Sequence, residues 1–493
     1  MYNDIDLAAL AEVCENAWDA FLVFKRTQVS QRALLMRTIA TALEETGDEL
    51  IAVAMKETNL PEARLRAERG RTIFQLLQYA DACEKGDWLE IRIDTAIPDK
   101  NPPKPDIRKM LVPLGPVAVF GASNFPFAYS TAGGDTACAL AAGCPVIVKA
   151  HPAHEETSTI VAQAIQKAVE KCGMPKNIFT HVYGKSFEVG KALVTNHRIK
   201  AVGFTGSYGG GKQLFDWANQ RPEPIPVFAE MGSVNPVFIL NEKLEHEYAT
   251  VAQQYAGSIT LGVGQFCTNP GLLFATKSPG LDEFKLALAT AIKEINPGTM
   301  LHTGIAKAYA SKREVALSQP SVSLVAESST APNEGQGQPT VATVSGEQFL
   351  ANPLLHQEVF GPYSLLVECN DTNQMLQIAR QLEGQLTATI MGTEADLKSN
   401  INLIEAVKNI CGRIILNGVP TGVEVCLSMH HGGPFPSTTD ARFTSVGADG
   451  IKRFARPLSF QNWPNSLLPE ALKNENPLHM WRTVNNQLTQ SAM

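Results

Sequence analysis

Residues 117–149 read VAVFGASNFPFAYSTAGGDTACALAAGCPVIVK, and this stretch decides the fold. It contains two short apolar runs, Val117–Phe120 and Pro145–Lys149, which are typical of buried strands. The small residues between them, from Thr131 to Ala142, predict a helix. The alternation continues with a helix over 155–172 and strands over 178–183 and 199–204. This order predicts an α/β fold with a parallel sheet, which binds ligands beyond the carboxyl ends of its strands.

The chain on either side of this stretch has a different character. Residues 5–90 carry apolar side chains at helical spacing, whereas the prolines within 92–109 prevent a continuous helix and predict an extended arm. A second α/β region begins near residue 230, and its polar segment 328–337 is expected to be a surface loop. With 493 residues, the chain is long enough for two or more domains.

The composition is that of a globular protein and argues against several classes. Hydrophobic residues make up 44% and charged residues 18%, and the net charge of −7 leaves no polycationic surface for nucleic acid. No run approaches the ~18 apolar residues needed to cross a membrane, and the N-terminus lacks a signal segment, so we expect a cytoplasmic protein. The nine cysteines are scattered without a CxxC pair, which predicts neither disulfides nor a metal site.

One cysteine differs from the others in its surroundings. Cys267 lies in Gly262-Val-Gly-Gln-Phe-Cys-Thr-Asn-Pro-Gly271, where the flanking residues predict a turn that a ligand can approach closely. A thiolate there is a strong nucleophile that forms labile thioesters. The alternative is a buried structural cysteine.

A carboxylate ends the apolar run Pro226-Val-Phe-Ala-Glu230 and is followed by Met-Gly. A glutamate in an apolar setting has a raised pKa, which suits a general base near neutral pH. The alternative is a glutamate in a salt bridge or a helix cap.

A glycine-rich loop, Gly206-Ser207-Tyr-Gly-Gly-Gly211-Lys212, lies between a predicted strand and a predicted helix. Its free N–H groups at a helix N-terminus predict an anion site for a cofactor pyrophosphate. It nearly matches the phosphate loop of NTPases, but Gln213 replaces the hydroxyl residue that holds magnesium. A nucleotide-binding NTPase is therefore a weaker alternative.

Two further polar residues follow predicted strands. Asn124 comes just after 117–120, where its amide could donate to a developing oxyanion or form an Asx turn. Lys149 ends the next strand and could reach ribose hydroxyls or a phosphate. His151 and His154 follow it, and we expect a role in the loop for them rather than metal binding.

Seven segments together resemble the aldehyde dehydrogenase superfamily, in order and over nearly the whole chain. The matching segments are Asn124-Phe-Pro126, Val146-Ile-Val-Lys149, Phe204-Thr-Gly-Ser207, Glu230-Met-Gly232, Gly264-Gln-Phe-Cys-Thr268, Glu358-Val-Phe-Gly-Pro362 and Leu416-Asn-Gly418. One such motif is weak evidence, but seven in register identify the chain as resembling this superfamily.

The resemblance implies a covalent mechanism. Cys267 attacks the aldehyde, and the oxyanion is held by the Asn124 amide and the Cys267 backbone N–H. Hydride then leaves for the nicotinamide, and Glu230 activates the water that hydrolyses the thioester. The loss of one oxyanion donor is expected to cost on the order of 3 kcal/mol.

The resemblance also implies a cofactor site. Lys149 and Glu358 would hold ribose hydroxyls, Phe360 would pack near the nicotinamide ribose, and Gly206 and Ser207 would line the pyrophosphate site.

The sequence departs from the common pattern after the strand lysine. Many members carry Pro-Ala/Ser-Glu there, and that glutamate binds the adenosine ribose and would repel a 2′-phosphate. Here Ala150-His-Pro-Ala-His154 stands instead, which favours NADP while NAD remains possible. A position of Glu188 near the adenosine ribose would count against NADP.

Four segments narrow the resemblance to the α-ketoglutarate semialdehyde dehydrogenases of this superfamily. They are 149–154, 419–426, 431–440 and 442–447. This implies oxidation of 2,5-dioxovalerate to 2-oxoglutarate, and the nearest alternative is an NADP-dependent fatty-aldehyde dehydrogenase. A semialdehyde with a distal carboxylate needs a cation, ideally an arginine, but the predicted helix 131–142 contains none.

The resemblance implies a cofactor domain of Rossmann type, an α/β catalytic domain and a β oligomerisation arm. The expected ranges are 1–92 with 112–229, 230–435, 93–111 with 440–465, and a C-terminal tail over 466–493. A dimer or tetramer is expected through the arm. A catalytically inactive binding protein is a further alternative, although such a protein would need none of Cys267, Glu230 and Asn124.

Overall fold

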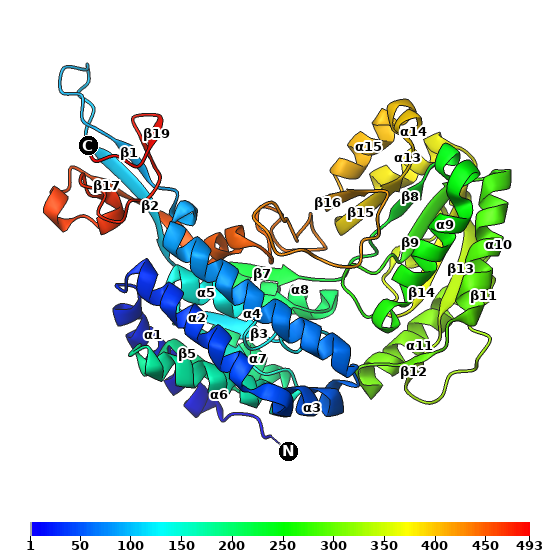
Figure 1. Cartoon of the computed structure of the whole chain (residues 1–493), viewed down its shortest axis with the longest axis horizontal. Helices are drawn as coiled ribbons and strands as arrows, with labels where there is room; N and C mark the ends of the chain where they lie inside the picture. The colour runs from blue at the N-terminus through cyan, green and yellow to red at the C-terminus, as the bar shows by residue number, and fades with distance from the viewer. Residues whose placement is uncertain (1) are drawn as a thin grey trace.

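The computed structural model describes residues 2–493 and begins with four helices. They are α1 (Leu7–Phe24), α2 (Val29–Glu45), α3 (Gly47–Thr58) and α4 (Glu62–Lys85). Asp6 caps α1, because its side chain accepts hydrogen bonds from the backbone N–H groups of Ala8 and Ala9. Figure 1 shows α2 and α4 lying across the first sheet. The predicted helical character of residues 5–90 is therefore confirmed.

The first sheet has five parallel strands in the order β5-β4-β3-β6-β7. The strands are β3 (Val117–Phe120), β4 (Val146–Lys149), β5 (Phe179–Val182), β6 (Ala201–Thr205) and β7 (Val227–Glu230). The helices between and after them are α5 (Gly134–Ala142), α6 (Glu155–Lys171), α7 (Phe187–Thr195) and α8 (Tyr208–Asn219). The α/β alternation predicted from residues 117–149 is confirmed.

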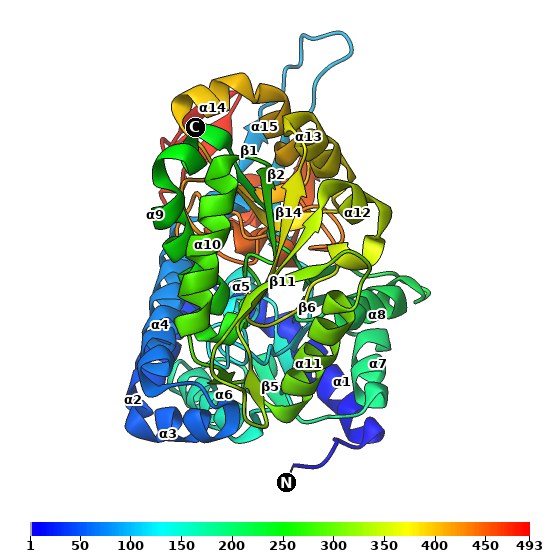
Figure 2. The ribbon, with the colours of Figure 1, turned by 90° about the vertical axis from the view of Figure 1, so that its right-hand side faces the viewer.

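The second sheet has seven strands in the order β11-β13-β14-β9-β8-β15-β16, and β11 pairs antiparallel in an otherwise parallel sheet. The strands are β8 (Val237–Ile239), β9 (Leu272–Thr276), β11 (Ser323–Glu327), β13 (Thr340–Ser345), β14 (Tyr363–Cys369), β15 (Gln385–Met391) and β16 (Cys411–Leu416). The helices are α9 (Asn241–Thr260), α10 (Pro279–Glu294), α11 (Thr303–Leu317), α12 (Gly346–Ala351), α13 (Thr372–Gln381), α14 (Glu394–Ser399) and α15 (Ile401–Lys408). Figure 2 shows α10 in front of this sheet.

Shorter elements join these units. The 3₁₀ helices are η1 (Asp87–Leu89), η2 (Lys176–Ile178), η3 (Leu261–Gly264), η4 (Pro353–His356), η5 (Ala448–Phe454), η6 (Asn465–Leu467) and η7 (Glu470–Leu472). The loop 328–337 is largely exposed, as expected, and it ends in β12 (Gln336–Gly337), which pairs with β10 (Gly298–Thr299).

The third sheet projects from the body as an arm (Figure 1). Its order is β17-β2-β1-β18-β19. The strands are β1 (Arg92–Asp94), β2 (Ile107–Pro113), β17 (Ala455–Gln461), β18 (Arg482–Val484) and β19 (Gln487–Thr489). The expected tail, 466–493, thus contributes two strands to this sheet. Within the expected arm range 440–465, residues 448–454 instead form η5, which packs against α5.

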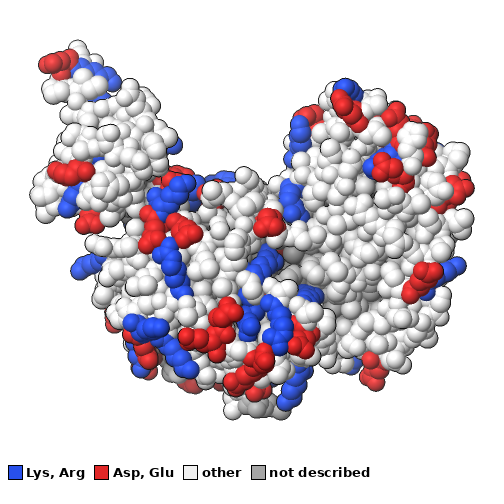
Figure 3. Space-filling model, viewed as in Figure 1, with Lys and Arg blue, Asp and Glu red and all other residues white. Residues whose placement is uncertain are grey.

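Surface properties agree with a globular body. Figure 3 shows basic and acidic side chains interspersed on one face, and an open notch separating the arm from the second domain. Among the helices of residues 2–493, none is both long enough and apolar enough to cross a lipid bilayer.

Candidate active site

Three predicted residues come from different elements and line one cleft. Asn124 follows β3, Glu230 is the last residue of β7, and Cys267 lies in the turn after η3. The cleft has a volume of about 440 Å³ and lies where the carboxyl ends of the first sheet's strands meet the second domain. This is the position that parallel sheets use for ligands.

Backbone packing fixes the turn that carries Cys267. Gly264 has a φ of +65°, and a Cβ atom there would lie 2.2 Å from the backbone of Gly361, so only glycine fits. The Asn235 side chain donates to the carbonyl oxygens of Cys267, at 2.8 Å, and Asn269, at 3.0 Å. The nucleophile therefore stands on a rigid support.

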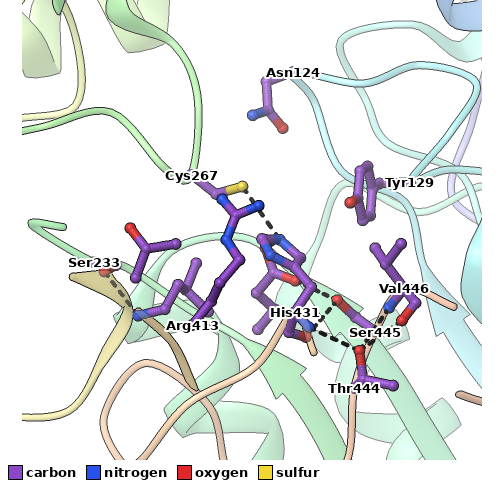
Figure 4. Close-up of polar contacts among 12 residues, drawn as sticks. Asn124, Tyr129, Ser233, Cys267, Arg413, His431, Thr444, Ser445 and Val446 are labelled. Atoms are coloured by element: carbon purple, nitrogen blue, oxygen red, sulfur yellow. Dashed lines mark hydrogen bonds and ion pairs between the residues drawn. The ribbon is translucent and has the colours of Figure 1, made fainter. Parts of the chain in front are cut away.

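A histidine joins the thiol to the carboxylate. His431 Nε2 lies 3.6 Å from Cys267 Sγ and 3.1 Å from Glu230 Oε1, and the other carboxylate oxygen accepts a hydrogen bond of 2.6 Å from Ser445 Oγ. Figure 4 shows Cys267 directed at the imidazole ring, with Ser445 on its other side. Thiol, imidazole and carboxylate form one group whose polar atoms all lie within 4.8 Å of one another.

Burial and neighbouring groups shift the pKa values of this group. Burial, assisted by the negative charge of Glu230, holds the pKa of the Cys267 thiol well above its usual value. Burial also raises the pKa of Glu230, but His431 and the Ser445 hydroxyl outweigh it and leave that pKa lowered. The raised pKa expected for Glu230 from its apolar flanks is therefore wrong, because the strand delivers the carboxylate to two hydrogen-bond donors.

The amide of Asn124 faces the same cleft. Its Nδ2 donates to the backbone carbonyl of Gln265 at 3.2 Å, and the backbone carbonyl of Asn124 accepts a hydrogen bond of 2.7 Å from Arg64 Nη2. The Arg64 guanidinium lies between the rings of Phe125 and Phe266, 5.0 and 4.8 Å from their centroids. These contacts set the position of Asn124 beside Cys267.

The other half of the cleft has the features of a nucleotide site. Gly206, Ser207 and Gly210 line it, and Ser207 caps α8 by accepting a hydrogen bond of 3.3 Å from the Gly210 N–H. The N-terminus of a helix thus faces the cleft, which suits a pyrophosphate.

Two residues from the second domain line the same half. Glu358 and Phe360 face the cleft, and burial raises the pKa of the Glu358 carboxyl to about 7 against the positive charge of Lys312. The Lys312 ammonium donates to the Glu358 backbone oxygen at 3.0 Å.

Two predicted cofactor residues lie outside the residues that line this cleft. Gly211 faces Met231, and a Cβ atom there would lie 2.6 Å from that side chain, so the glycine serves the packing of α8 on the sheet. Lys149 ends β4 with its ammonium 5.9 Å from the Phe120 ring centroid, and burial lowers its pKa.

The glycine loop also differs from a phosphate loop of NTPases in its lysine. Lys212 is engaged by Asp216, with 2.7 Å to both carboxylate oxygens. The lysine of an NTPase must reach the phosphates, so this ion pair counts against that alternative.

The histidines after β4 have separate surroundings. His154 is fully buried and its Nε2 lies 2.8 Å from the Ala122 carbonyl oxygen, whereas His151 lines the cleft with His302. Glu188 is exposed in the first turn of α7 and is not among the residues that line the cleft.

Comparison with known proteins matches residues 2–456 to the family model described as "Aldehyde dehydrogenase family". The chain belongs to the aldehyde dehydrogenase family. It is 47% identical to "Alpha-ketoglutaric semialdehyde dehydrogenase 2" of Azospirillum brasilense, over 96% of this chain and 91% of that protein. It is 44% identical to "Alpha-ketoglutaric semialdehyde dehydrogenase" of Acinetobacter baylyi, over 100% of this chain and 93% of that protein.

Solved structures share the aldehyde dehydrogenase fold. The NADP-dependent glyceraldehyde-3-phosphate dehydrogenase of Bacillus halodurans, solved with NADP, has a TM-score of 0.79 at 20% identity, over 93% of this chain and 92% of that one. Proline utilization A of Bradyrhizobium japonicum has a TM-score of 0.78 at 21% identity over 93% of this chain, which spans only 45% of that larger protein. These likenesses confirm the predicted fold class.

In this aldehyde dehydrogenase the sequence motifs assigned no role to His431 or Ser445. His431 lies within the glycine- and proline-rich run 417–436, which reads as a loop, and Ser445 follows that run. Their segment runs beside β7, where Met231 N–H donates to the Ser437 carbonyl at 2.8 Å. Segments 431–440 and 442–447, which contain these residues, supported the family resemblance, but neither pattern nor spacing gave the two side chains a catalytic role.

Proposed function

We propose that this aldehyde dehydrogenase oxidises 2,5-dioxovalerate to 2-oxoglutarate through a thioester on Cys267, with NADP as the preferred acceptor and NAD as the alternative. The observation that carries the proposal is the meeting of Cys267, Glu230 and Asn124 in a cleft whose other half is a glycine-lined helix N-terminus. The names of the relatives from Azospirillum and Acinetobacter support the choice of substrate.

The reaction starts at the sulfur atom. Cys267 loses its proton and attacks the aldehyde carbon, and the oxygen gains negative charge beside the Asn124 amide. His431 Nε2 lies near both Cys267 Sγ and Glu230 Oε1, so the proton that leaves the sulfur can pass to the carboxylate, and Glu230 must release it to solvent before the hydrolytic step. This route matters because burial keeps the thiol protonated at neutral pH.

The nicotinamide cofactor, when bound, accepts the hydride that leaves the aldehyde carbon. In this chain Gly206 and Ser207 would hold its pyrophosphate, Glu358 its ribose hydroxyls, and Phe360 would pack beside the ribose. The fit rests on the glycine cradle at the start of α8 and on the two residues facing it across the cleft. We include Lys149 near the adenosine ribose, although it lies outside the lining of the cleft.

Hydrolysis of the thioester falls to Glu230. Its lowered pKa keeps it ionised at neutral pH, so it accepts a proton from water as the water attacks the thioester carbon and the thiolate leaves. The hydrogen bonds from Ser445 and His431 orient the carboxylate for this step.

Preference for NADP rests on the surroundings of Lys149. The chain has Ala150-His-Pro-Ala-His154 where many family members have a ribose-binding glutamate, so no carboxylate in this segment would repel a 2′-phosphate. Within residues 2–493, Lys149 forms no ion pair and stays available for a phosphate. The ratio of kcat/KM with NADP to that with NAD measures this preference directly.

The test of the function compares substrates and two variants. We expect wild-type enzyme to reduce NADP with 2,5-dioxovalerate at a higher kcat/KM than with succinate semialdehyde, glutaraldehyde or a long-chain alkanal. Cys267→Ala abolishes all of these activities. A higher kcat/KM for the long alkanal would replace the proposal with a fatty-aldehyde dehydrogenase.

Glu230→Gln separates the two half-reactions. The first hydride transfer survives as a burst of about one NADPH per site, and steady-state turnover falls by at least about 10²-fold because water lacks its base. Stopped-flow absorbance at 340 nm resolves the two phases. Full turnover in Glu230→Gln would remove Glu230 from the hydrolytic step.

A further inference from the structure

The proposed substrate carries a carboxylate, and the cleft needs a cation to bind it. Resting on the proposed function, we propose that Arg71 is the residue that binds the distal carboxylate of the substrate, with Arg413 as a second cation whose side chain points toward Cys267 and Tyr129. The sequence motifs predict neither residue as part of the site. Arg71 lies on α4 and Arg413 on β16, 342 positions apart in the chain.

Arg71 reaches the site from α4. Its Nη2 lies 3.3 Å from Tyr129 Oη, and its guanidinium carbon lies 5.5 Å from the centroid of that ring. Tyr129 in turn faces His431, with 6.4 Å between ring centroids, and His431 contacts Cys267. The ring of Tyr129 therefore lies next to both Arg71 and the His431 that contacts Cys267.

The guanidinium of Arg71 has donors to spare. Its Nε is buried without a hydrogen-bond partner, and among the ion pairs of residues 2–493 Arg71 forms none. Glu68 is the nearest carboxylate on the same helix, but its Oε1 accepts the backbone N–H groups of Phe127 and Ala128, at 2.9 and 3.0 Å. Arg71 is partly exposed, and a guanidinium that has a buried donor without a partner and no ion pair gains from binding an anion.

Arg413 approaches from β16 of the second sheet. Figure 4 shows its side chain rising from β16 toward Cys267 and Tyr129. Its terminal nitrogens hold the 417–436 segment through the carbonyls of Pro420, at 2.9 Å, and Gly422, at 3.2 Å, while its Nε is buried without a partner. It forms no ion pair within the described chain.

The third arginine in this region has another task. Arg64 is fixed between Phe125 and Phe266 and holds the Asn124 carbonyl, so we assign it to positioning Asn124. This leaves Arg71, whose Nε has no partner and whose Nη2 bonds only the Tyr129 hydroxyl, as the arginine with donors for a carboxylate.

The chemistry of the substrate fits this arrangement. The carboxylate carbon of 2,5-dioxovalerate lies about 5 Å from the aldehyde carbon when the chain is extended, so its partner must stand in the same cavity as Cys267. A carboxylate takes two parallel N–H donors from a guanidinium, a geometry that lysine does not offer. The positive charge of Arg71 also opposes the burial that raises the pKa of Cys267.

The experiment compares one carboxylated and one uncharged aldehyde of equal length, 2,5-dioxovalerate and pentanal, by kcat/KM with NADP. We expect the ratio of the two values to fall about 100-fold in Arg71→Met and to recover only partly in Arg71→Lys. Arg413→Met lowers the same ratio less. The matched control is Arg66→Met, on the same helix but half-exposed and paired with Glu62 and Asp48, which leaves the ratio unchanged.

A second readout does not depend on turnover. Glutarate, an unreactive dicarboxylate, should raise the Tm of the wild-type enzyme and of Arg66→Met, and should lose this effect in Arg71→Met. The inference is overturned if Arg71→Met keeps the wild-type ratio and the response to glutarate. A wild-type enzyme that prefers pentanal would instead overturn the proposed substrate, so the two failures are distinct.

Discussion

At the level of single residues, the catalytic group combines a thiol with a high pKa and a carboxylate with a low one. Cys267 is partly exposed and Glu230 is buried, and burial raises the pKa of both groups, yet the net shifts are opposite. The thiol lacks strong donors, whereas the carboxylate accepts hydrogen bonds from His431 and Ser445. At neutral pH the group therefore holds an ionised carboxylate, which can act as a base, beside a protonated thiol. A protonated thiol is a weak nucleophile, which limits its side reactions before substrate binds.

Ser445→Ala tests the hydrogen bond that lowers the pKa of Glu230. A carboxyl with a lowered pKa stays ionised until the pH falls through that value, and removal of a donor moves the value upward. We expect the acidic limb of the kcat profile to shift to higher pH by about one unit, while the alkaline limb stays in place. Ser437→Ala, which removes a hydroxyl bonded to the Pro434 carbonyl, is the control with an unshifted profile.

Glu358 gives a second pH dependence at this scale. Its pKa of about 7 means that the carboxylate, which accepts hydrogen bonds from ribose hydroxyls, forms as the pH rises through neutrality. The Kd for NADP should therefore decrease between pH 6 and 8, by about tenfold, in titrations followed by fluorescence. In Glu358→Gln the Kd should be larger and nearly independent of pH. A wild-type Kd that is flat across this range would contradict the role of Glu358.

The catalytic residues could be predicted from the sequence where they lie in a contiguous motif. Glu230 and Asn124 each end or follow a short apolar run, so their place at the strand ends could be inferred, and Cys267 was marked by its glycine-flanked turn and the family motif. His431 and Arg71 could not, because they reach the site through long-range packing: the first is 164 positions from Cys267, and the second sits on a helix whose own pattern shows only amphipathicity. Gly211 was assigned by its motif, but packing against Met231 decides its role.

At the level of elements, one buried ion pair joins two segments that flank the site. Arg453 of η5 contacts Asp135 of α5 at 2.6 Å, and the two side chains are only 3% and 14% exposed. Because η5 follows the segment that carries Ser445, this pair anchors the wall behind Glu230. The prediction of a helix over 131–142 located α5, but periodicity does not predict a contact with Arg453, which lies 318 positions after Asp135.

Asp135→Asn should destabilise this contact strongly. The substitution keeps the shape of the side chain and leaves the Arg453 guanidinium buried without its counter-charge, so we expect a loss of about 3 kcal/mol in the free energy of unfolding. Denaturation in urea, followed by circular dichroism, measures it. The surface pair Glu394–Lys398 provides the control, since Glu394→Gln should cost less than about 0.5 kcal/mol.

For the whole molecule, the arm is the part without an evident role in a single chain. Its sheet has two free edges, β17 and β19, and large apolar side chains on and beside it are exposed, among them Trp463 at 50% and Leu488 at 68%. Free edges and exposed apolar side chains favour association with another copy. We propose, as the family resemblance implies, that the enzyme assembles as a dimer or tetramer through this arm.

The double variant Trp463→Glu/Leu488→Glu tests that assembly. Charges on both apolar positions would have to be buried in the interface, so we expect the oligomer to dissociate toward a chain of 53.3 kDa at micromolar concentration. Light scattering coupled to gel filtration gives the mass. Leu286→Glu, equally exposed at 66% but on α10 and far from the arm in sequence, should keep the wild-type mass. An unchanged mass in the double variant would place the interface on another face and leave the arm without a role in assembly.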